Sequence, residues 1–293
     1  MRLDDERESG NVEDLRGSRR RLPIGGRGAV GGIVAIVIII GGLLLGVDPQ
    51  VLLGIVGGVD GPAPQQQSAQ MTSPGTGGEG TDPQRRFVAQ ILGSTEDVWT
   101  AQMQAIGQRY IPPKLVLFTG AVDSGCGLAQ TAVGPFYCPN DQKVYLDLDF
   151  FRELQGRLGA KGDFARAYVI AHEVGHHVQN LLGLMSNVQA ARQQLSPSDR
   201  NALSVLVELQ ADCYAGLWAN HANRDRHILE QGDIEQGLNA VAAVGDDRLQ
   251  RAARGTVAPD KFTHGSSAQR VAWFSRGLRT GSMEQCNTFK RQQ

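Results

Sequence analysis

Apolar and polar residues are segregated along this chain, and their pattern divides it into four parts. Residues 1–28 mix acidic residues and arginine with few apolar side chains, so we expect a disordered tail. Residues 29–47 (AVGGIVAIVIIIGGLLLGV) carry no charge and are long enough for one transmembrane helix. Residues 48–84 start with a second, shorter apolar run and become rich in Gly, Pro, Gln, Ser and Thr, which is typical of a flexible linker. The folded domain is therefore expected at residues 85–293.

Within that domain, a few strand signals precede a series of helical patterns. We expect strands at residues 115–118 and 143–148, separated by a Gly-rich stretch. We expect helices at residues 94–107, 163–182, 196–220, 234–244 and 267–278. This order predicts a mainly helical α+β fold with a small antiparallel sheet, not a doubly wound parallel sheet.

An arginine cluster directly precedes the apolar run and predicts its orientation. Between residues 16 and 27 there are five arginines and no acidic residue (Arg16, Arg19, Arg20, Arg21 and Arg27). The positive-inside rule then predicts a signal-anchor helix with a cytoplasmic N-terminus and the domain outside the cytoplasm. A cleaved signal peptide fits less well, because the preceding tail is long and no small-residue cleavage site follows closely. A buried core helix and a nucleic-acid-binding tail are the remaining alternatives.

Charge and cysteine content narrow the classes of function and the compartment. The chain has 29 basic and 30 acidic residues, so a chain-wide basic nucleic-acid binder is excluded and no nucleic-acid partner is expected. Four cysteines without a CxxC motif fit an oxidising compartment. The simplest pairing joins Cys126 to Cys138 and Cys213 to Cys286, and four free thiols are the alternative.

His172-Glu173-Val174-Gly175-His176 is an HExxH motif inside a predicted helix. Residues four apart stack on one face of a helix, so both imidazoles can bind one zinc ion. Glu173, about 100° around the helix, can take a proton from a zinc-bound water. The alternative is an accidental motif on a solvated helix.

A hydrolytic zinc site takes three protein ligands and a water, so a third ligand is required. The extended HExxHxxGxxH pattern is excluded, because Gln179 stands in place of its glycine and Leu182 in place of its third histidine. Glu208 and Asp212 lie four apart on a later helix, on a face with small apolar neighbours, where two carboxylates are costly unless something neutralises them. We predict Glu208 as the third ligand and Asp212 as hydrogen-bond acceptor for a ligand histidine. An exposed pair of carboxylates is the alternative.

Three further residues are candidates for a supporting role. His264 precedes a predicted helix N-terminus, where it could stabilise negative charge developing on the substrate oxygen or play a structural part. Arg270 could pair with a buried carboxylate or anchor the substrate. Tyr168 is a weaker candidate for stabilising the oxyanion, and a packed core tyrosine is favoured. Of the other histidines, His177 is predicted to be packed or hydrogen-bonded, and His221 and His227 to be solvated.

Three blocks of sequence resemble a known family. AHEVGHHVQ (171–179), VELQADCYAGLW (207–218) and FTHGSSAQRVAWF (262–274) resemble the bacterial neutral zinc metallopeptidases, and their order is distantly similar to gluzincins of the CAAX-protease and HtpX type. The resemblance covers most of residues 85–293. It implies a zincin-like domain with His172, His176 and Glu208 as zinc ligands and Glu173 as catalytic acid and base. Those gluzincins read THP where this chain reads Thr263-His264-Gly265, so the match at His264 is partial.

These observations predict a membrane-anchored zinc endopeptidase that acts outside the cytoplasm with one Zn²⁺. Its partners would be the membrane and a peptide or protein substrate, which the hairpin at residues 134–146 would bind as an added strand. A catalytically silent zinc scaffold of the cell envelope, a metal-free interaction module and a non-peptide zinc hydrolase are the alternatives.

Overall fold

The computed structural model describes residues 1–17, 82–130 and 134–290, and its main sheet has four strands in the order β1-β2-β6-β5. The strands are β1 (Val12–Asp14), β2 (Lys114–Phe118), β5 (Phe136–Cys138) and β6 (Lys143–Asp147). Strands β1, β2 and β6 are parallel, and β5 is antiparallel to β6. A separate antiparallel hairpin joins β3 (Ala121–Ser124) to β4 (Gly127–Gln130).

The predicted strands are confirmed, but the predicted antiparallel sheet is wrong for the three parallel strands. Strand β5 runs opposite to β2, and the chain turns back from β5 into β6, so β6 regains the direction of β2. Both central strands are buried along nearly their whole length. Their alternate residues enter two separate apolar clusters, one on each face of the sheet, as expected when a parallel sheet is covered on both faces.

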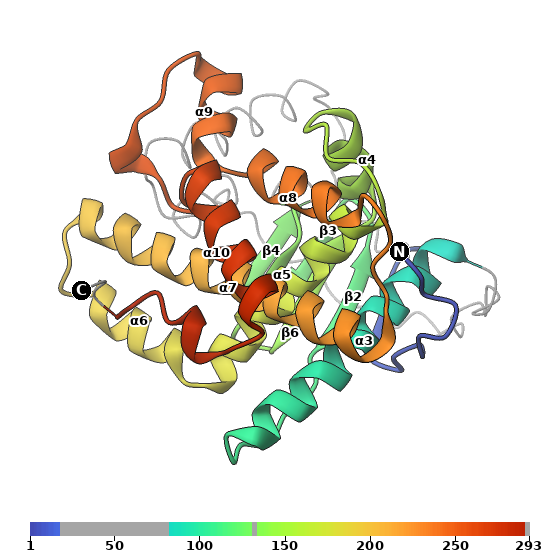
Figure 1. Cartoon of the computed structure of the whole chain (residues 1–293). Coiled ribbons are helices and arrows are strands. Elements are labelled where there is room, and N and C mark those ends of the chain that lie inside the picture. The colour runs from blue at the N-terminus through green and yellow to red at the C-terminus, as the bar shows by residue number, and fades with distance from the viewer. Residues whose placement is uncertain (18–81, 131–133, 291–293) are drawn as a thin grey trace, which may run out of the picture.

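Helices make up most of the described chain and cover one face of the sheet (Figure 1), while the β3–β4 hairpin packs on the other. They are α3 (Pro83–Ala105), α4 (Asp149–Gly156), α5 (Asp163–Leu181), α6 (Leu184–Arg192), α7 (Pro197–Arg226), α8 (Asp233–Ala243), α9 (Asp246–Arg254) and α10 (Ser267–Thr280), with two short 3₁₀ turns, Pro259–Lys261 and Glu284–Cys286. The fold is therefore α+β and mainly helical. Helices α5, α7, α8 and α10 occupy the predicted positions, with ends shifted by a few residues.

The first helix of the domain, α3, begins well before the predicted start at Ser94. Asp82 is its N-cap, because the carboxylate accepts a hydrogen bond from the backbone N–H of Gln84 at 2.9 Å, and Pro83 occupies the first helical position. These signals lie in the stretch that composition assigned to the linker. Helix α3 therefore includes the last residues of the predicted linker.

Residues 1–17, which we call the N-terminal arm, are part of the folded domain. The prediction of a disordered tail is wrong for these residues, because β1 adds to the edge of the main sheet and Val12 packs into the core. In Figure 1 the arm (blue) lies beside α3. The remainder of the predicted tail, the predicted transmembrane helix at 29–47 and most of the linker lie outside the described residues. Among the helices that the structure describes, none is long and apolar enough to cross a membrane.

Helices α5, α7 and α10 form successive layers that position the site. Helix α5 packs against strands β5 and β6, and α7 packs against both α5 and α10. The backbones of α7 and α10 touch: a Cβ atom on Gly277 of α10 would lie 1.9 Å from the carbonyl oxygen of Cys213. A disulfide joins Cys213 to Cys286, which fixes the end of the chain to α7, and a second joins Cys126 to Cys138. Both predicted pairings are confirmed.

Candidate metal centre

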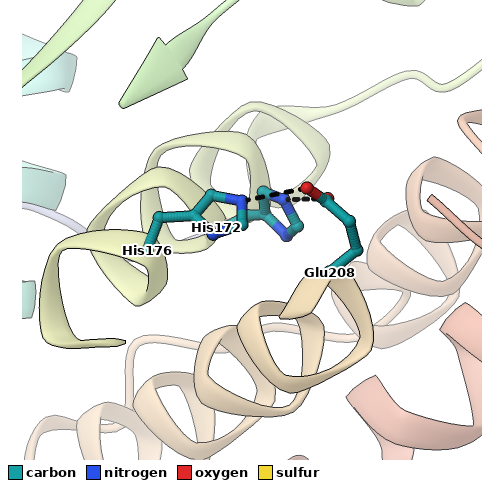
Figure 2. Close-up of side chains that lie close together, drawn as sticks. All are labelled: His172, His176 and Glu208. Atoms are coloured by element: carbon teal, nitrogen blue, oxygen red, sulfur yellow. Dashed lines mark hydrogen bonds and ion pairs between the residues drawn. The ribbon is translucent and has the colours of Figure 1, made fainter. Parts of the chain in front are cut away.

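Helix α5 presents His172 and His176 on one face, one turn apart, as the HExxH spacing requires. Both imidazoles are largely buried, and their ring centroids are 4.7 Å apart. The face is directed toward α7, which points the carboxylate of Glu208 at both rings, as Figure 2 shows. Nε2 of His172 lies 3.2 Å from Oε2 of Glu208, and Nε2 of His176 lies 3.5 Å from Oε1.

These three side chains fit one zinc ion. Each offers one donor atom, and the three atoms lie within 4.8 Å of one another. Donors about 2 Å from a tetrahedral zinc are separated by roughly 3.3 Å, so the two histidine–carboxylate separations already match such a site. Two imidazoles with one carboxylate are a donor set that hydrolytic zinc sites use. The sequence therefore identified a triad that the fold brings together.

A hydrogen bond to Asp212 fixes the orientation of the His172 ring. Its Nδ1 lies 3.0 Å from Oδ1 of Asp212, one turn beyond Glu208 on α7. Asp212 is fully buried. Its carboxylate also accepts hydrogen bonds from Nε and Nη2 of Arg270 on α10, at 2.8 and 2.9 Å, and from the hydroxyl of Tyr168 at 2.6 Å. An ionised carboxylate accepts hydrogen bonds and cannot donate them, so Nδ1 of His172 carries a proton. Nε2, which faces Glu208, is the nitrogen that would bind a metal.

His176 is held in the same way, by a residue whose role sequence reasoning missed. Oε1 of Gln179 lies 2.9 Å from Nδ1 of His176. The amide nitrogen of Gln179 donates to the carbonyl of Val207 and to Oε1 of Gln210, at 2.8 and 3.0 Å, which fixes the amide orientation. Nδ1 of His176 must then donate, and its Nε2, which faces Glu208, is the nitrogen that would bind a metal. In the sequence Gln179 marks a departure from the extended motif, and its place one turn beyond His176 is the signal for this role.

The charges in the centre are strongly coupled because they are buried together. Burial would lower the pKa of His172, but the hydrogen bonds and charges of Asp212 and Glu208 outweigh it and raise the pKa of His172 to about 10. Burial would raise the pKa of Glu208 and of Asp212, but the charges of His176 and Arg270 respectively, among others, hold both pKa values below their ordinary ranges. Both carboxylates are therefore anionic at neutral pH, as a cation site requires.

Glu173, the middle residue of the motif, differs from its neighbours. Burial raises the pKa of its carboxylate, although the nearby charges of His172 and His176 oppose this. Within the described part of the chain, no residue makes a hydrogen bond to the Glu173 carboxylate. The carboxylate is therefore available to exchange a proton with a group bound beside the two histidines.

The segment that carries His264 lies against the turn of α7 that contains Glu208. A Cβ on Gly265, which has a φ of +93°, would come within 3.2 Å of Val205 and 3.3 Å of Leu209. Partial burial of the ring would lower the pKa of His264, but the charge of Glu208 and the hydrogen bond to Asp246 raise it. The side chain is half exposed, and its charge contributes to lowering the pKa of Glu208.

Asp246, a second residue that sequence reasoning missed, shapes the His264 segment. Its Oδ2 accepts the backbone N–H groups of Thr263, His264 and Gly265 at 2.7 to 2.9 Å, and its Oδ1 lies 3.3 Å from Nδ1 of His264. The carboxylate therefore fixes both the backbone and the ring of His264. No sequence signal connects Asp246 to residues so much later in the chain.

The other candidate residues and histidines are held by contacts within the fold or are exposed. The hydroxyl of Tyr168 and the guanidinium of Arg270 are buried and bound to Asp212, and to each other at 3.1 Å, so Arg270 pairs with a buried carboxylate. His177 is packed and hydrogen-bonded, with Nε2 2.6 Å from the carbonyl of Ile111. The prediction that His221 is solvated is wrong: it is buried, with Nε2 2.7 Å from the carbonyl of Gly281, because the chain after α10 returns over α7. His227 is exposed, as predicted.

Comparisons with known proteins agree with this geometry. The family model described as "Putative neutral zinc metallopeptidase" matches residues 1–289. The chain is 46% identical to the uncharacterized protein YpfJ of Escherichia coli (strain K12) over 294 residues, which is 99% of each chain. It is 44% identical over 214 residues to the uncharacterized proteins Mb2605 of Mycobacterium bovis and Rv2575 of Mycobacterium tuberculosis, covering 70% of this chain and 71% of theirs. No solved structure matches.

Proposed function

The chain belongs to this zinc metallopeptidase family, and from that premise we propose that it is a zinc-dependent endopeptidase. The observation that carries the proposal is the convergence of His172, His176 and Glu208, with Nδ1 of each histidine held by another side chain. Such a centre suits catalysis because its ligands are oriented before the metal arrives. When bound there, zinc would polarise the scissile carbonyl and lower the pKa of a water molecule toward neutrality.

Glu173 is the general base and then the general acid in this proposal. Its raised pKa and its lack of a hydrogen-bonding partner within the described residues suit a group that takes a proton from the attacking water. The same carboxyl group then delivers the proton to the amine that leaves. One residue can perform both steps because protonation by the water prepares it for donation.

His264 stabilises the negative charge that develops on the substrate oxygen. Its raised pKa favours the imidazolium form, which donates from both ring nitrogens, and its half-exposed position leaves room for a substrate. With Nδ1 directed to Asp246, Nε2 is the atom that would donate to the substrate. Asp246 positions the ring and stabilises its charge.

The substrate in this proposal is a peptide or protein segment bound along β5. In the main sheet, β5 occupies one edge, next to β6. The hydroxyl of Tyr137 on β5 lies 3.0 Å from Nδ1 of His177 and 2.9 Å from Nδ2 of Asn180, so this edge is fixed to the helix of the HExxH motif. An extended peptide added to β5 would gain backbone hydrogen bonds beside the metal centre, and it would need no particular side chain for them.

The domain would act outside the cytoplasm and at a membrane. Two disulfides are typical of an extracytoplasmic domain. The uncharged run at residues 29–47 supplies enough apolar length for attachment to a bilayer.

The test combines metal analysis with a broad peptide library, using the full chain in detergent. We expect about one zinc per chain and cleavage of internal peptide bonds. Glu173→Gln should retain zinc and lose cleavage, while Glu153→Gln, which changes an exposed glutamate on α4, should retain both. Zinc without cleavage of any library member would favour an inert zinc scaffold, and absence of stoichiometric metal would favour a metal-free module.

The contribution of the β5 edge is tested separately. Phe136→Ala should raise KM for peptides more than it lowers kcat, because Phe136 forms part of this edge and stacks on Tyr145 at 4.8 Å between ring centroids. Leu128→Ala, at an exposed position on the separate hairpin, is the matched control. Unchanged KM in Phe136→Ala would count against substrate binding along β5.

A further inference from the structure

The N-terminal arm is bound to the domain as a strand. Backbone pairing between β1 and β2 places Val12 opposite Leu115 and Asp14 opposite Leu117. Hydrogen bonds continue beyond the strand, from the N–H of Leu115 to the carbonyl of Asn11 at 2.9 Å and from the N–H of Leu15 to the carbonyl of Leu117 at 2.8 Å. The arm therefore completes one edge of the sheet.

Helix α3 has a buried carboxylate that the arm satisfies. Glu96 is 5% exposed and accepts hydrogen bonds from Ser9 Oγ at 2.6 Å, Asn11 Nδ2 at 2.7 Å and Arg7 Nη2 at 2.8 Å. One turn earlier, a Cβ on Gly93 would lie 2.6 Å from the carbonyl oxygen of Arg7, so a glycine is needed for the close passage of the arm. Without the arm, Glu96 would be a buried charge lacking all three donors, which is an unfavourable state.

Charges elsewhere on the domain also pair with the arm. Glu6 is buried and lies 2.7 Å from Nε of Arg226 at the end of α7. Glu13 lies 2.8 Å from the ammonium groups of both Lys114 and Lys143, on two different strands. The arm thus contacts α3, α7 and the main sheet, and its position is specified along most of its length.

The end of the arm contacts the start of α3. Nη2 of Arg16 lies 2.6 Å from Oδ2 of Asp82, the N-cap of α3. The end of the arm and the start of α3 therefore lie at one place. Arg16 is also one of the five arginines counted by the positive-inside rule, and here its charge is paired with Asp14 and Asp82.

From these contacts we propose that the arm and the catalytic domain lie on the same side of the membrane, so that residues 18–81 cross it an even number of times or not at all. A single crossing would separate the flanks of the apolar run by a hydrocarbon core of about 30 Å, whereas Arg16 and Asp82 are in contact. The predicted single pass with a cytoplasmic N-terminus is incompatible with the paired β1 and β2 strands. Since the disulfides are typical of an extracytoplasmic domain, the arm is on that side as well. This inference does not depend on peptidase activity.

Thiol labelling of the full chain in cells tests the proposal. All four native cysteines are in disulfides, so one added cysteine provides a specific label. Asp5→Cys reports the arm and Ser198→Cys reports the domain, and both positions are exposed. A membrane-impermeant maleimide is applied to spheroplasts before and after permeabilisation, with a cytoplasmic thiol protein as the control.

We expect both variants to be labelled equally before permeabilisation. Labelling of one variant alone in sealed spheroplasts would overturn the proposal, because the two regions would then lie on opposite sides. Labelling of both only after permeabilisation would support the shared side and overturn its assignment as extracytoplasmic.

A cross-link tests the contact itself in the membrane-bound chain. Glu8 and Arg86 are exposed, and Nε of Arg86 lies 3.5 Å from Oε1 of Glu8. Replacing these two side chains leaves the buried contacts of the arm intact. Glu8→Cys and Arg86→Cys in one chain, joined by a short bis-maleimide, should hold the arm to the domain after cleavage at a protease site inserted between residues 67 and 68. Each single variant should release the N-terminal fragment on a denaturing gel. Release from the double variant as well would overturn the proposal.

Discussion

Asp212 and Arg270 form a buried ion pair directly behind His172. Nε and Nη2 of Arg270 bind the two carboxylate oxygens of Asp212 at 2.8 and 2.9 Å, and neither side chain is more than 4% exposed. A bidentate pair of this kind fixes the plane of the carboxylate. The orientation of His172 is therefore set by α10, a helix that contributes no metal ligand.

Removing the charge of Asp212 should weaken the metal site. We expect Asp212→Asn to lower zinc affinity 10- to 100-fold, because the amide is a weaker acceptor for Nδ1 of His172. Arg270 would also lose its buried counter-ion, which should cost about 3 kcal/mol of unfolding free energy. Competition with a chelator and denaturant unfolding measure the two effects. Asp225→Asn, at an exposed position on the same helix, should change neither.

Gln179 should be required for the orientation of His176. Gln179→Leu removes the acceptor for Nδ1 of His176, and we expect zinc affinity to fall about 10-fold. Gln179→Glu keeps an acceptor but loses the two donated hydrogen bonds, so it should bind zinc nearly normally and unfold more easily. Equal zinc affinity in the Leu variant and the unmodified chain would contradict the assigned role.

His264 should act on the rate of the reaction and not on the metal. His264→Ala should lower kcat 10²- to 10³-fold with little change in zinc content, and Asp246→Asn should act in the same direction. His264 is proposed to act when protonated and its pKa is raised, so kcat should decline as pH rises through that pKa. The decline should be absent in His264→Ala. His227→Asn, which changes an exposed histidine, is the control, and an unchanged kcat in His264→Ala would refute the role.

His177 should make the domain sensitive to acid. Burial lowers the pKa of His177 to about 4, against an ordinary value near 6.5 in the unfolded chain. The unfolded state therefore binds the proton first, and stability should fall by about 3 kcal/mol as pH drops from 6.5 through 4. The comparison needs the metal-free protein, because acid also releases zinc. His177→Gln should show a smaller loss over this interval, and an identical loss would exclude His177 as the cause.

What the sequence could predict depended on how local each signal was. His172 and His176 are linked by helical spacing alone, and the small residues around Glu208 indicated a face on which a neighbouring helix packs closely. The pairing of Asp246 with His264 depends instead on three backbone N–H groups that converge only after the chain has folded. Composition could not identify β1, because it has only three residues and Val12 is its single apolar side chain. The parallel direction of β2 and β6 likewise depends on pairing between distant segments.

The contact between α7 and α10 makes the centre vulnerable to changes at residues with no chemical role. Any side chain at Gly277 would force the two helices apart, and the displacement would reach Arg270 and Asp212, since these residues join the same pair of helices. A screen that scores activity would therefore identify Gly277 as indispensable. Loss of activity there would report the spacing between two backbones, and zinc retention would distinguish it from loss of a ligand.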